Sequence, residues 1–376
     1  MLSRKPPMGF NTWNTFGEKI SDSVIRETAD AMVEMGLLDA GYEYLVIDDC
    51  WSLRDRDPVT GKIVPDPVKF PEGMKAVSDY VHSKGLKFGM YSCAGTRTCA
   101  DYPGSFDHEY LDAETFAEYG ADFLKYDFCY KPQSANGPLL YRRMGMALKA
   151  CGREILFSAC NWGCDDVETW IRSTGAHMYR STGDINDNFR SFKDIALSQI
   201  DKLAYSAPGC FNDIDMLICG MYGSGNVANG GCTDEEYKTH FALWCMFSSP
   251  LMLGGDLRKL KDQPFILNLI KNRNLIRINQ DEEGRPAVAV CRRDGDRVTF
   301  AKHLSNNEIA IMFANLNDDD GNCELFFDEL GITAAGGYGL EMTECFTGEN
   351  IGVKKEYMKR RIPAHGCEVF ICKLSR

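Results

Sequence analysis

Short apolar runs alternate with longer amphipathic segments along the first three quarters of the chain. Eight of these runs are nearly continuous in apolar residues, without polar residues at every second position. They span residues 6–13, 44–49, 87–92, 123–128, 154–160, 177–182, 210–217 and 250–256. Such runs are typical of strands that are buried on both faces, as in a parallel sheet.

The segments between these runs predict helices. Residues 21–37 place Ile25, Ala29 and Met32 on one helical face. Thr233 and Glu236 have the spacing of a capping box ahead of another apolar helix. Further helices are expected over residues 74–84, 112–119, 138–151, 165–174, 187–203 and 261–273.

Eight alternating strands and helices over about 280 residues are the count and length of a (β/α)8 TIM barrel. A doubly wound open sheet is the alternative α/β fold, but it usually has fewer strands. Neither GxGxxG nor GxxxxGK[ST] occurs in the chain. We therefore predict a catalytic barrel domain over residues 1–285.

The pattern changes after the segment "NQDEEGRPAV". Short β-like runs follow one another, separated by Asp, Asn and Gly, and no segment of useful length has a helical period. This texture is typical of antiparallel strands joined by turns. We predict a small C-terminal antiparallel β-sandwich domain over residues 286–376.

Composition and charge narrow the classes of partner. The chain is 44% hydrophobic and 26% charged, with a formal net charge of −12. A negative surface argues against nucleic acid and anionic membranes, and leaves neutral small molecules as partners. No apolar stretch approaches the ~20 residues that a membrane span needs.

The sixteen cysteines and six histidines do not indicate a metal centre. They form no CxxC, HxH or HExxH pair, so we expect neither a metal nor another cofactor. No apolar signal segment precedes the first predicted strand, and the cysteines look unpaired. We expect a cytoplasmic protein on these grounds.

Polar and aromatic residues gather where the predicted strands end, which is where a (β/α)8 barrel builds its active site. Carboxylates accept hydrogen bonds from sugar hydroxyls, and aromatic rings cover the apolar face of a sugar. The pattern therefore indicates a sugar site. Its candidate residues are Trp13, Asp48, Asp49, Tyr91, Lys125, Asp127, Asn161, Trp162, Arg180, Asp184 and Asp213.

The fourth predicted strand, "FLKYDF", carries two opposite charges. Lys125 and Asp127 are two residues apart and so lie on the same side of the strand. A nearby cation would keep Asp127 ionised, as a nucleophile needs. Asp184, across the barrel mouth, would be the matching acid/base.

Eight stretches, in order along the barrel, together resemble glycoside hydrolase family 27, the α-galactosidases and melibiases. They are "MGFNTWNTF" (8–16), "VIDDCW" (46–51), "KFGMYSCAGTRTC" (87–99), "FLKYDFC" (123–129), "SACNWG" (158–163), "YRSTGDI" (179–185), "FNDIDML" (211–217) and "INQDEEG" (278–284). The resemblance implies a (β/α)8 barrel with a C-terminal β-domain and a retaining double displacement at α-galactosides. It also implies that the protein needs no cofactor.

The resemblance also assigns roles to the candidate residues. It makes Asp127 the nucleophile and Asp184 the acid/base. Asp48 and Asp49 would bind the O4 and O6 hydroxyls of the sugar. Trp13 and Trp162 would form walls on either side of the sugar ring. Polar contacts with the sugar are implied for Tyr91, Lys125 and Arg180. Asp213 and Met216 would line the far side of the site.

Cysteines show where the chain departs from secreted members of the family. Cys50 and Cys160 lack the partners with which those members form two disulfides. Cys99 and Cys129 match a third, active-site bridge, and the redox state of this pair stays open. The loss of two bridges supports the cytoplasmic expectation.

Several alternatives remain open. The Asp48–Asp49 pair favours galactose over arabinopyranose, and Asn161 favours a 2-hydroxyl over an N-acetyl group. α-N-Acetylgalactosaminidase and β-L-arabinopyranosidase are the alternatives within the family. A sugar-binding protein on an inactive hydrolase scaffold would be expected to have lost Asp127 or Asp184, and both are present.

The expected substrates are α-galactosides of the melibiose or raffinose type. A glycine-rich segment, "CGMYGSGNVANGGC", follows the seventh predicted strand. It is expected either to shape the site entrance or to form a subunit contact, so a homo-oligomer stays open.

Overall fold

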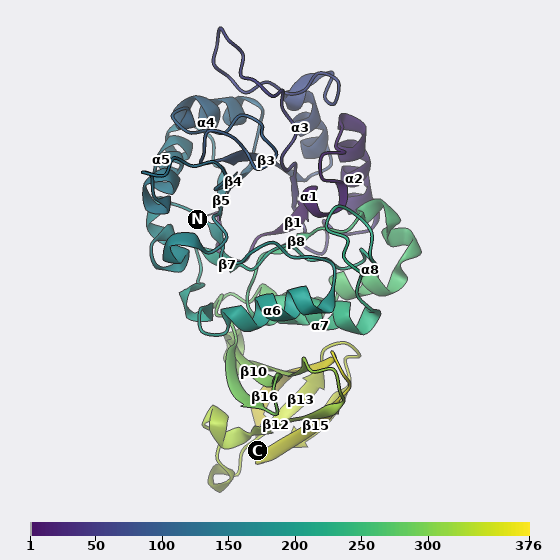
Figure 1. Cartoon of the computed structure of the whole chain (residues 1–376). Helices are drawn as coiled ribbons and strands as arrows, with labels where there is room; N and C mark the ends of the chain where they lie inside the picture. The colour runs from purple at the N-terminus through teal and green to yellow at the C-terminus, as the bar shows by residue number, and fades with distance from the viewer. Residues whose placement is uncertain (1) are drawn as a thin grey trace.

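The computed structural model describes residues 2–376 and consists of a barrel followed by a β-domain (Figure 1). Eight parallel strands form the barrel in the order β7-β6-β5-β4-β3-β2-β1-β8. They are β1 (Met8–Asn11), β2 (Tyr44–Val46), β3 (Lys87–Cys93), β4 (Phe123–Asp127), β5 (Leu156–Cys160), β6 (Met178–Arg180), β7 (Phe211–Asp213) and β8 (Leu251–Leu253). Seven of them lie within the predicted runs, and β3 extends one residue beyond its run, so the predicted fold class is confirmed.

The barrel closes just beyond β7. The Leu217 N–H donates to the Met252 carbonyl, and the Gly254 N–H donates to the Leu217 carbonyl, both at 2.8 Å. Asp215 lies between β7 and this bridge with φ 86°, a left-handed conformation that bends the strand. The residues after β7 therefore face the barrel mouth.

Helices surround the sheet as the amphipathic segments predict (Figure 1). They are α1 (Trp13–Phe16), α2 (Asp22–Glu34), α3 (Gly73–Ser83), α4 (Glu109–Glu118), α5 (Gly137–Ala150), α6 (Phe189–Gln199), α7 (Asp234–Met246), α8 (Pro264–Ile270) and α9 (Arg273–Asn279). The capping box of α7 forms between Thr233 and Glu236. None of the helices in residues 2–376 is long and apolar enough to cross a membrane.

Two of the predicted helices are wrong in detail. Residues 165–174 form two 3-10 helices, η1 (Cys164–Thr169) and η2 (Ile171–Thr174), because Asp165 and Asp166 have positive φ values. The predicted helix over 261–273 is divided between η4 (Leu257–Asp262) and α8. Pro264 begins α8 because it lacks an N–H to continue η4.

A layer of inward-facing side chains fills the barrel. This layer consists of Tyr44, Val46, Phe123, Leu156, Met178, Met216 and Met252, with Trp13 packed against it. A barrel interior is filled in this way because alternate residues of each strand point inward. Any ligand site must therefore lie at an end of the barrel.

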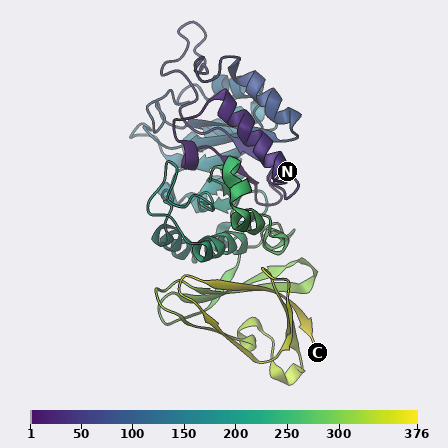
Figure 2. The same cartoon turned by 90° about the vertical axis from the view of Figure 1, so that its right-hand side faces the viewer.

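The C-terminal domain is a two-layered antiparallel sandwich, seen from the side in Figure 2. One layer has the order β14-β13-β16-β11-β10-β9, and the other pairs β12 with β15. The strands are β9 (Val288–Arg293), β10 (Arg297–Leu304), β11 (Glu308–Asn315), β12 (Gly321–Phe326), β13 (Gly339–Glu344), β14 (Asn350–Lys354), β15 (Tyr357–Ile362) and β16 (Cys367–Ser375). The predicted boundary at residue 285 lies in the segment between α9 and β9.

The six-stranded layer packs on the barrel along α6 and α7 (Figure 1). Phe300, Met312 and Val369 of this layer belong to the same apolar cluster as the barrel residues. The opposite face of the layer packs its own cluster, with Phe313, Met342 and Phe370, against β12 and β15. The two domains therefore share a continuous core.

Candidate active site

A pocket opens at the carboxyl ends of the barrel strands, where the predicted site residues converge. Most of its lining side chains are polar or aromatic. They are Trp13, Asn14, Asp48, Asp49, Tyr91, Cys99, Lys125, Asp127, Cys160, Trp162, Arg180, Asp184, Asp215, Met216 and Val227. A wider cavity of about 500 Å³ lies beside α5, but its lining offers Glu154 with basic and apolar residues rather than paired carboxylates.

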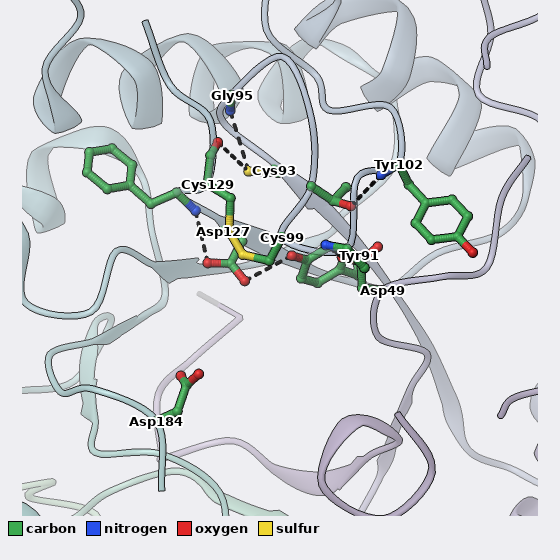
Figure 3. Close-up of a disulfide and its surroundings, with 12 residues drawn as sticks. Asp49, Tyr91, Cys93, Gly95, Cys99, Tyr102, Asp127, Cys129 and Asp184 are labelled. Atoms are coloured by element: carbon green, nitrogen blue, oxygen red, sulfur yellow. Dashed lines mark hydrogen bonds between the residues drawn. A yellow bond between two sulfur atoms is a disulfide. The ribbon is translucent and has the colours of Figure 1, made fainter. Parts of the chain in front are cut away.

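Asp127 is buried and held in a fixed orientation at the end of β4. Its Oδ1 accepts a hydrogen bond from the Phe128 N–H, and its Oδ2 accepts one from the Tyr91 hydroxyl, both at 2.9 Å (Figure 3). Burial raises the pKa of Asp127 to about 6, although the Lys125 charge and both hydrogen bonds oppose the shift. The carboxyl group is thus mainly ionised above pH 6.

Lys125, predicted as the cation near Asp127, forms its ion pair with Asp48. Its Nζ donates to Asp48 Oδ2 at 2.8 Å, and the Asn11 Nδ2 donates to the same oxygen at 2.7 Å. Asp48 reaches Lys125 because β2 and β4 both flank β3. Lys125 therefore favours ionised Asp127 only through its charge, and burial of Asp127 outweighs that effect.

Asp184 lies across the pocket from Asp127 (Figure 3). It follows β6, and its side chain is 76% exposed. The Arg180 side chain is only 5% exposed, and its guanidinium donates to Asp184 Oδ1 at 2.9 Å and contacts Asp215 Oδ2 at 2.6 Å. The two candidate carboxyl groups thus have opposite environments, one buried and one open to water.

Asp48 and Asp49 both line the pocket and are both buried. Besides its contacts with Asn11 and Lys125, Asp48 accepts the Asp49 N–H at 2.9 Å. Asp49 accepts the N–H groups of Cys50 at 2.7 Å and Ala100 at 3.1 Å. These bonds fix the orientation of both carboxylates.

Trp13 and Trp162 bring aromatic surface to the pocket. Trp162 has φ 60°, an uncommon value for a bulky residue, and its ring meets Phe128 edge to face at 6.3 Å. Backbone strain of this kind clusters at functional sites, where the surrounding packing maintains it.

Two predicted residues do not line this pocket. Asn161 is fully buried, and its Nδ2 donates to the Cys164 carbonyl at 2.7 Å. Asp213 instead lines a small cavity deeper in the barrel, beside Asn11, Met178 and Met252. Side chains alternate along a strand, so Asn161 points away while its neighbours Cys160 and Trp162 face the pocket.

The sequence analysis did not assign Asp215 to the site. Asp215 lines the pocket, pairs with Arg180 and accepts the Ile185 N–H at 2.6 Å. The signal was present in the sequence, since Asp215 is two residues after Asp213 and nearer the end of the predicted run 210–217. Asn14, Cys160 and Val227 also line the pocket without having been assigned to it.

Cys99 and Cys129 form a disulfide beside Asp127 (Figure 3). The Asp127 carboxylate and both sulfur atoms lie within 4.8 Å of one another. Both sulfurs are engaged in the disulfide, so this cluster does not offer thiolate ligands to a metal. Cys93 lies against the bridge, and its Sγ donates to the Cys129 carbonyl at 3.2 Å.

Comparison with known proteins places this site in a family. A family model described as alpha galactosidase A matches residues 6–281, and one described as the alpha galactosidase C-terminal beta sandwich domain matches residues 294–372. The chain belongs to the α-galactosidase family, glycoside hydrolase family 27. It is therefore an enzyme of that family, as the resemblance predicted.

Individual relatives agree with this assignment over nearly the whole chain. An α-galactosidase of Cyamopsis tetragonoloba is 39% identical over 371 residues, covering 98% of this chain and 86% of its own. α-Galactosidase I of Mortierella vinacea has a TM-score of 0.90 at 32% identity, covering 99% of this chain and 97% of its own. The Saccharomyces cerevisiae α-galactosidase with raffinose has a TM-score of 0.89 at 28% identity, covering 99% of this chain and 98% of its own.

Proposed function

We propose that the chain is an exo-acting, retaining α-galactosidase that needs no cofactor. The observation that carries the proposal is the pair of aspartates in opposite environments across one pocket. Asp127 is buried and fixed by two hydrogen bonds, which suits a nucleophile. Asp184 is open to water and lies across the pocket from Asp127, which suits a general acid and base.

The reaction then takes two steps. An Asp127 oxygen attacks the anomeric carbon while the glycosidic C–O bond breaks, and Asp184 gives its proton to the leaving oxygen. Asp184, now a carboxylate, next removes a proton from water. That water attacks the anomeric carbon, the bond to Asp127 breaks, and galactose leaves with its configuration retained.

The remaining lining residues are proposed to position the sugar. Asp48 and Asp49 accept hydrogen bonds from O4 and O6, and Lys125 stays bound to Asp48. Trp13 and Trp162 cover the apolar faces of the ring. Tyr91, Arg180 and Met216 complete the enclosure, and Asp215 takes the place on the far side that the resemblance assigned to Asp213.

The proposed substrates are α-galactosides of the melibiose or raffinose type. Support comes from the yeast relative whose structure contains raffinose. Asn161 no longer favours galactose over N-acetylgalactosamine, because its side chain does not line the pocket. α-N-Acetylgalactosaminidase and β-L-arabinopyranosidase activities therefore need a direct comparison.

A panel of p-nitrophenyl glycosides tests the proposal. We expect the α-galactoside to be hydrolysed well ahead of the α-N-acetylgalactosaminide and the β-L-arabinopyranoside. Asp127→Asn should lower kcat at least about 10³-fold, because the neutral amide cannot attack the anomeric carbon. Asp201→Asn, which changes an exposed aspartate after α6, is the control and should keep full activity.

Proton NMR of the first-formed galactose tests the mechanism separately. A retaining enzyme releases the α-anomer first, and release of the β-anomer would contradict the double displacement. Preference for another sugar in the panel would overturn the substrate proposal. Full activity of Asp127→Asn would remove Asp127 from the mechanism.

Location and assembly stay predictions. A cytoplasmic protein is expected from the cysteine pattern, but the Cys99–Cys129 disulfide is a feature more typical of oxidising compartments. Cell fractionation tests the location. Light scattering of the purified protein tests whether it forms a homo-oligomer.

A further inference from the structure

The glycine-rich segment between β7 and α7 lies beside the pocket mouth and is tied to two other parts of the barrel. We refer to residues 222–231 as the β7–α7 loop. The N–H groups of Asn226 and Val227 both donate to the Asn14 carbonyl, at 2.8 and 3.2 Å. The Asp187 N–H donates to the Val227 carbonyl at 3.0 Å.

Asp187 fixes both ends of this loop. It is completely buried, and its Oδ2 accepts the Gly223 N–H at 2.7 Å. Its backbone carbonyl accepts the Gly231 N–H at 2.8 Å, and its Oδ1 accepts the Tyr237 hydroxyl at 2.8 Å. The loop is therefore positioned by hydrogen bonds at its start, middle and end.

Glycine allows the loop to approach α1 closely. Gly225 has φ 92°, and a Cβ added there would lie 2.9 Å from the Asn14 carbonyl oxygen. The close approach places Val227 directly between Asn14, which follows Trp13, and Asp187, which lies three residues after Asp184. Val227 lines the pocket and is partly buried, whereas its neighbours Asn226 and Ala228 are exposed.

This position determines what Val227 meets during the reaction. The general acid protonates the leaving oxygen, so the leaving group must lie on the side of the pocket that carries Asp184. Val227 lies on that side, between the Asp184 segment and Trp13. Its two methyl groups offer an apolar contact, which suits the C–H face of an uncharged sugar ring.

We propose that Val227, held by the β7–α7 loop, forms the binding site for the leaving group and selects a neutral hexopyranose there. The inference rests on the proposed function, because the side on which the leaving group lies follows from the role of Asp184. The contact with Val227 raises kcat/KM for disaccharides such as melibiose. It contributes little to substrates whose leaving group is too small to reach Val227.

Comparison of two substrates tests the inference. Melibiose and methyl α-galactoside share the same galactosyl group, and both leaving alcohols need protonation by Asp184. Only melibiose carries a ring that reaches Val227. For Val227→Ala we expect kcat/KM on melibiose to fall about 10-fold relative to that on methyl α-galactoside, the effect of lost methyl contacts in an apolar site.

Asn229→Ala is the matched control, since Asn229 is an exposed residue of the same loop outside the pocket lining. Its ratio of the two kcat/KM values should equal that of the wild type. An equal change on both substrates in Val227→Ala, or none on either, would overturn the inference. Dissociation of an oligomer by Val227→Ala with an unaltered ratio would also overturn it, and would identify the loop as a subunit contact.

Failure of the proposed function is distinguishable from failure of this inference. If the wild-type enzyme hydrolyses neither substrate, the proposed α-galactosidase activity is wrong. If the wild-type enzyme hydrolyses both substrates but Val227→Ala leaves the ratio of their kcat/KM values unchanged, the proposed activity stands and the leaving-group site is wrong.

Discussion

The environment of single residues decides which aspartate does which task in the proposed site. Asp127 and Asp184 have the same side chain, yet one is 6% exposed as a residue and the other has a side chain 76% exposed. Burial raises the pKa of Asp127 to about 6, so its ionised form carries a desolvation cost. The ionised carboxylate is a stronger nucleophile when few water molecules solvate it.

The pH dependence of activity follows from this environment. We expect kcat/KM for an α-galactoside to fall as the pH drops through about 6, because protonated Asp127 cannot attack. Tyr91→Phe removes a hydrogen bond that stabilises the carboxylate, so it should move this limb to higher pH. A pH–rate profile of the wild type and of Tyr91→Phe measures both effects. If the acidic limb lies at the same pH in the two proteins, its assignment to Asp127 is contradicted.

At the scale of elements, the site depends on loops that are fixed to strand ends. The disulfide joins Cys99, in the segment after β3, to Cys129, just beyond β4. It lies beside the Asp127 carboxylate, and Ala100, next to Cys99, donates to Asp49 at 3.1 Å. The bridge therefore holds one pocket wall and part of the sugar site together.

Loss of the disulfide should weaken the fold and the site together. It closes a loop with a sequence separation of 30, for which chain entropy gives a stabilisation of about 3.6 kcal/mol. Cys99→Ser should lower the thermal unfolding midpoint and raise KM. Cys291→Ser, which changes a free and partly exposed cysteine of β9, is the control. Equal midpoints for the two variants would contradict this role.

At the scale of the whole molecule, the sandwich is bound to the barrel through a shared core and a buried lysine. Lys302 of β10 is fully buried and donates to Ser248 Oγ at 2.8 Å and to the Cys245 carbonyl at 3.2 Å. It also donates to the Ile278 carbonyl at 2.5 Å, just before the end of α9. One side chain thus links three parts of the domain interface.

Burial lowers the pKa of Lys302 to about 7, well below its ordinary value of 10.5. Between these two values the unfolded chain binds more protons than the folded protein, so this lysine makes stability rise with pH. The unfolding midpoint of the wild type relative to Lys302→Met should therefore increase from pH 7 to pH 9. Lys359→Met, at a half-exposed lysine of β15, should show no such trend.

The sequence by itself determined the barrel, its eight strands and most of the residues around the pocket. Buried parallel strands require continuous apolar runs, and the helices that cover them require apolar residues at a 3.6-residue period. Both patterns can be recognised from neighbouring residues in the sequence. Polar residues at the ends of such runs are equally visible. Asp48, Asp49, Asp127 and Asp184 were found in this way.

The tertiary structure alone decided which of these side chains meet. Lys125 pairs with Asp48 rather than Asp127 because neighbouring strands bring distant residues together at distances that no local spacing encodes. Asn161 lies outside the pocket because side chains alternate along a strand, and the bend at Asp215 brings that residue, rather than Asp213, into the pocket. Likewise, Val227 is held at the mouth by hydrogen bonds to Asn14 and Asp187, which lie 213 and 40 residues before it in the sequence.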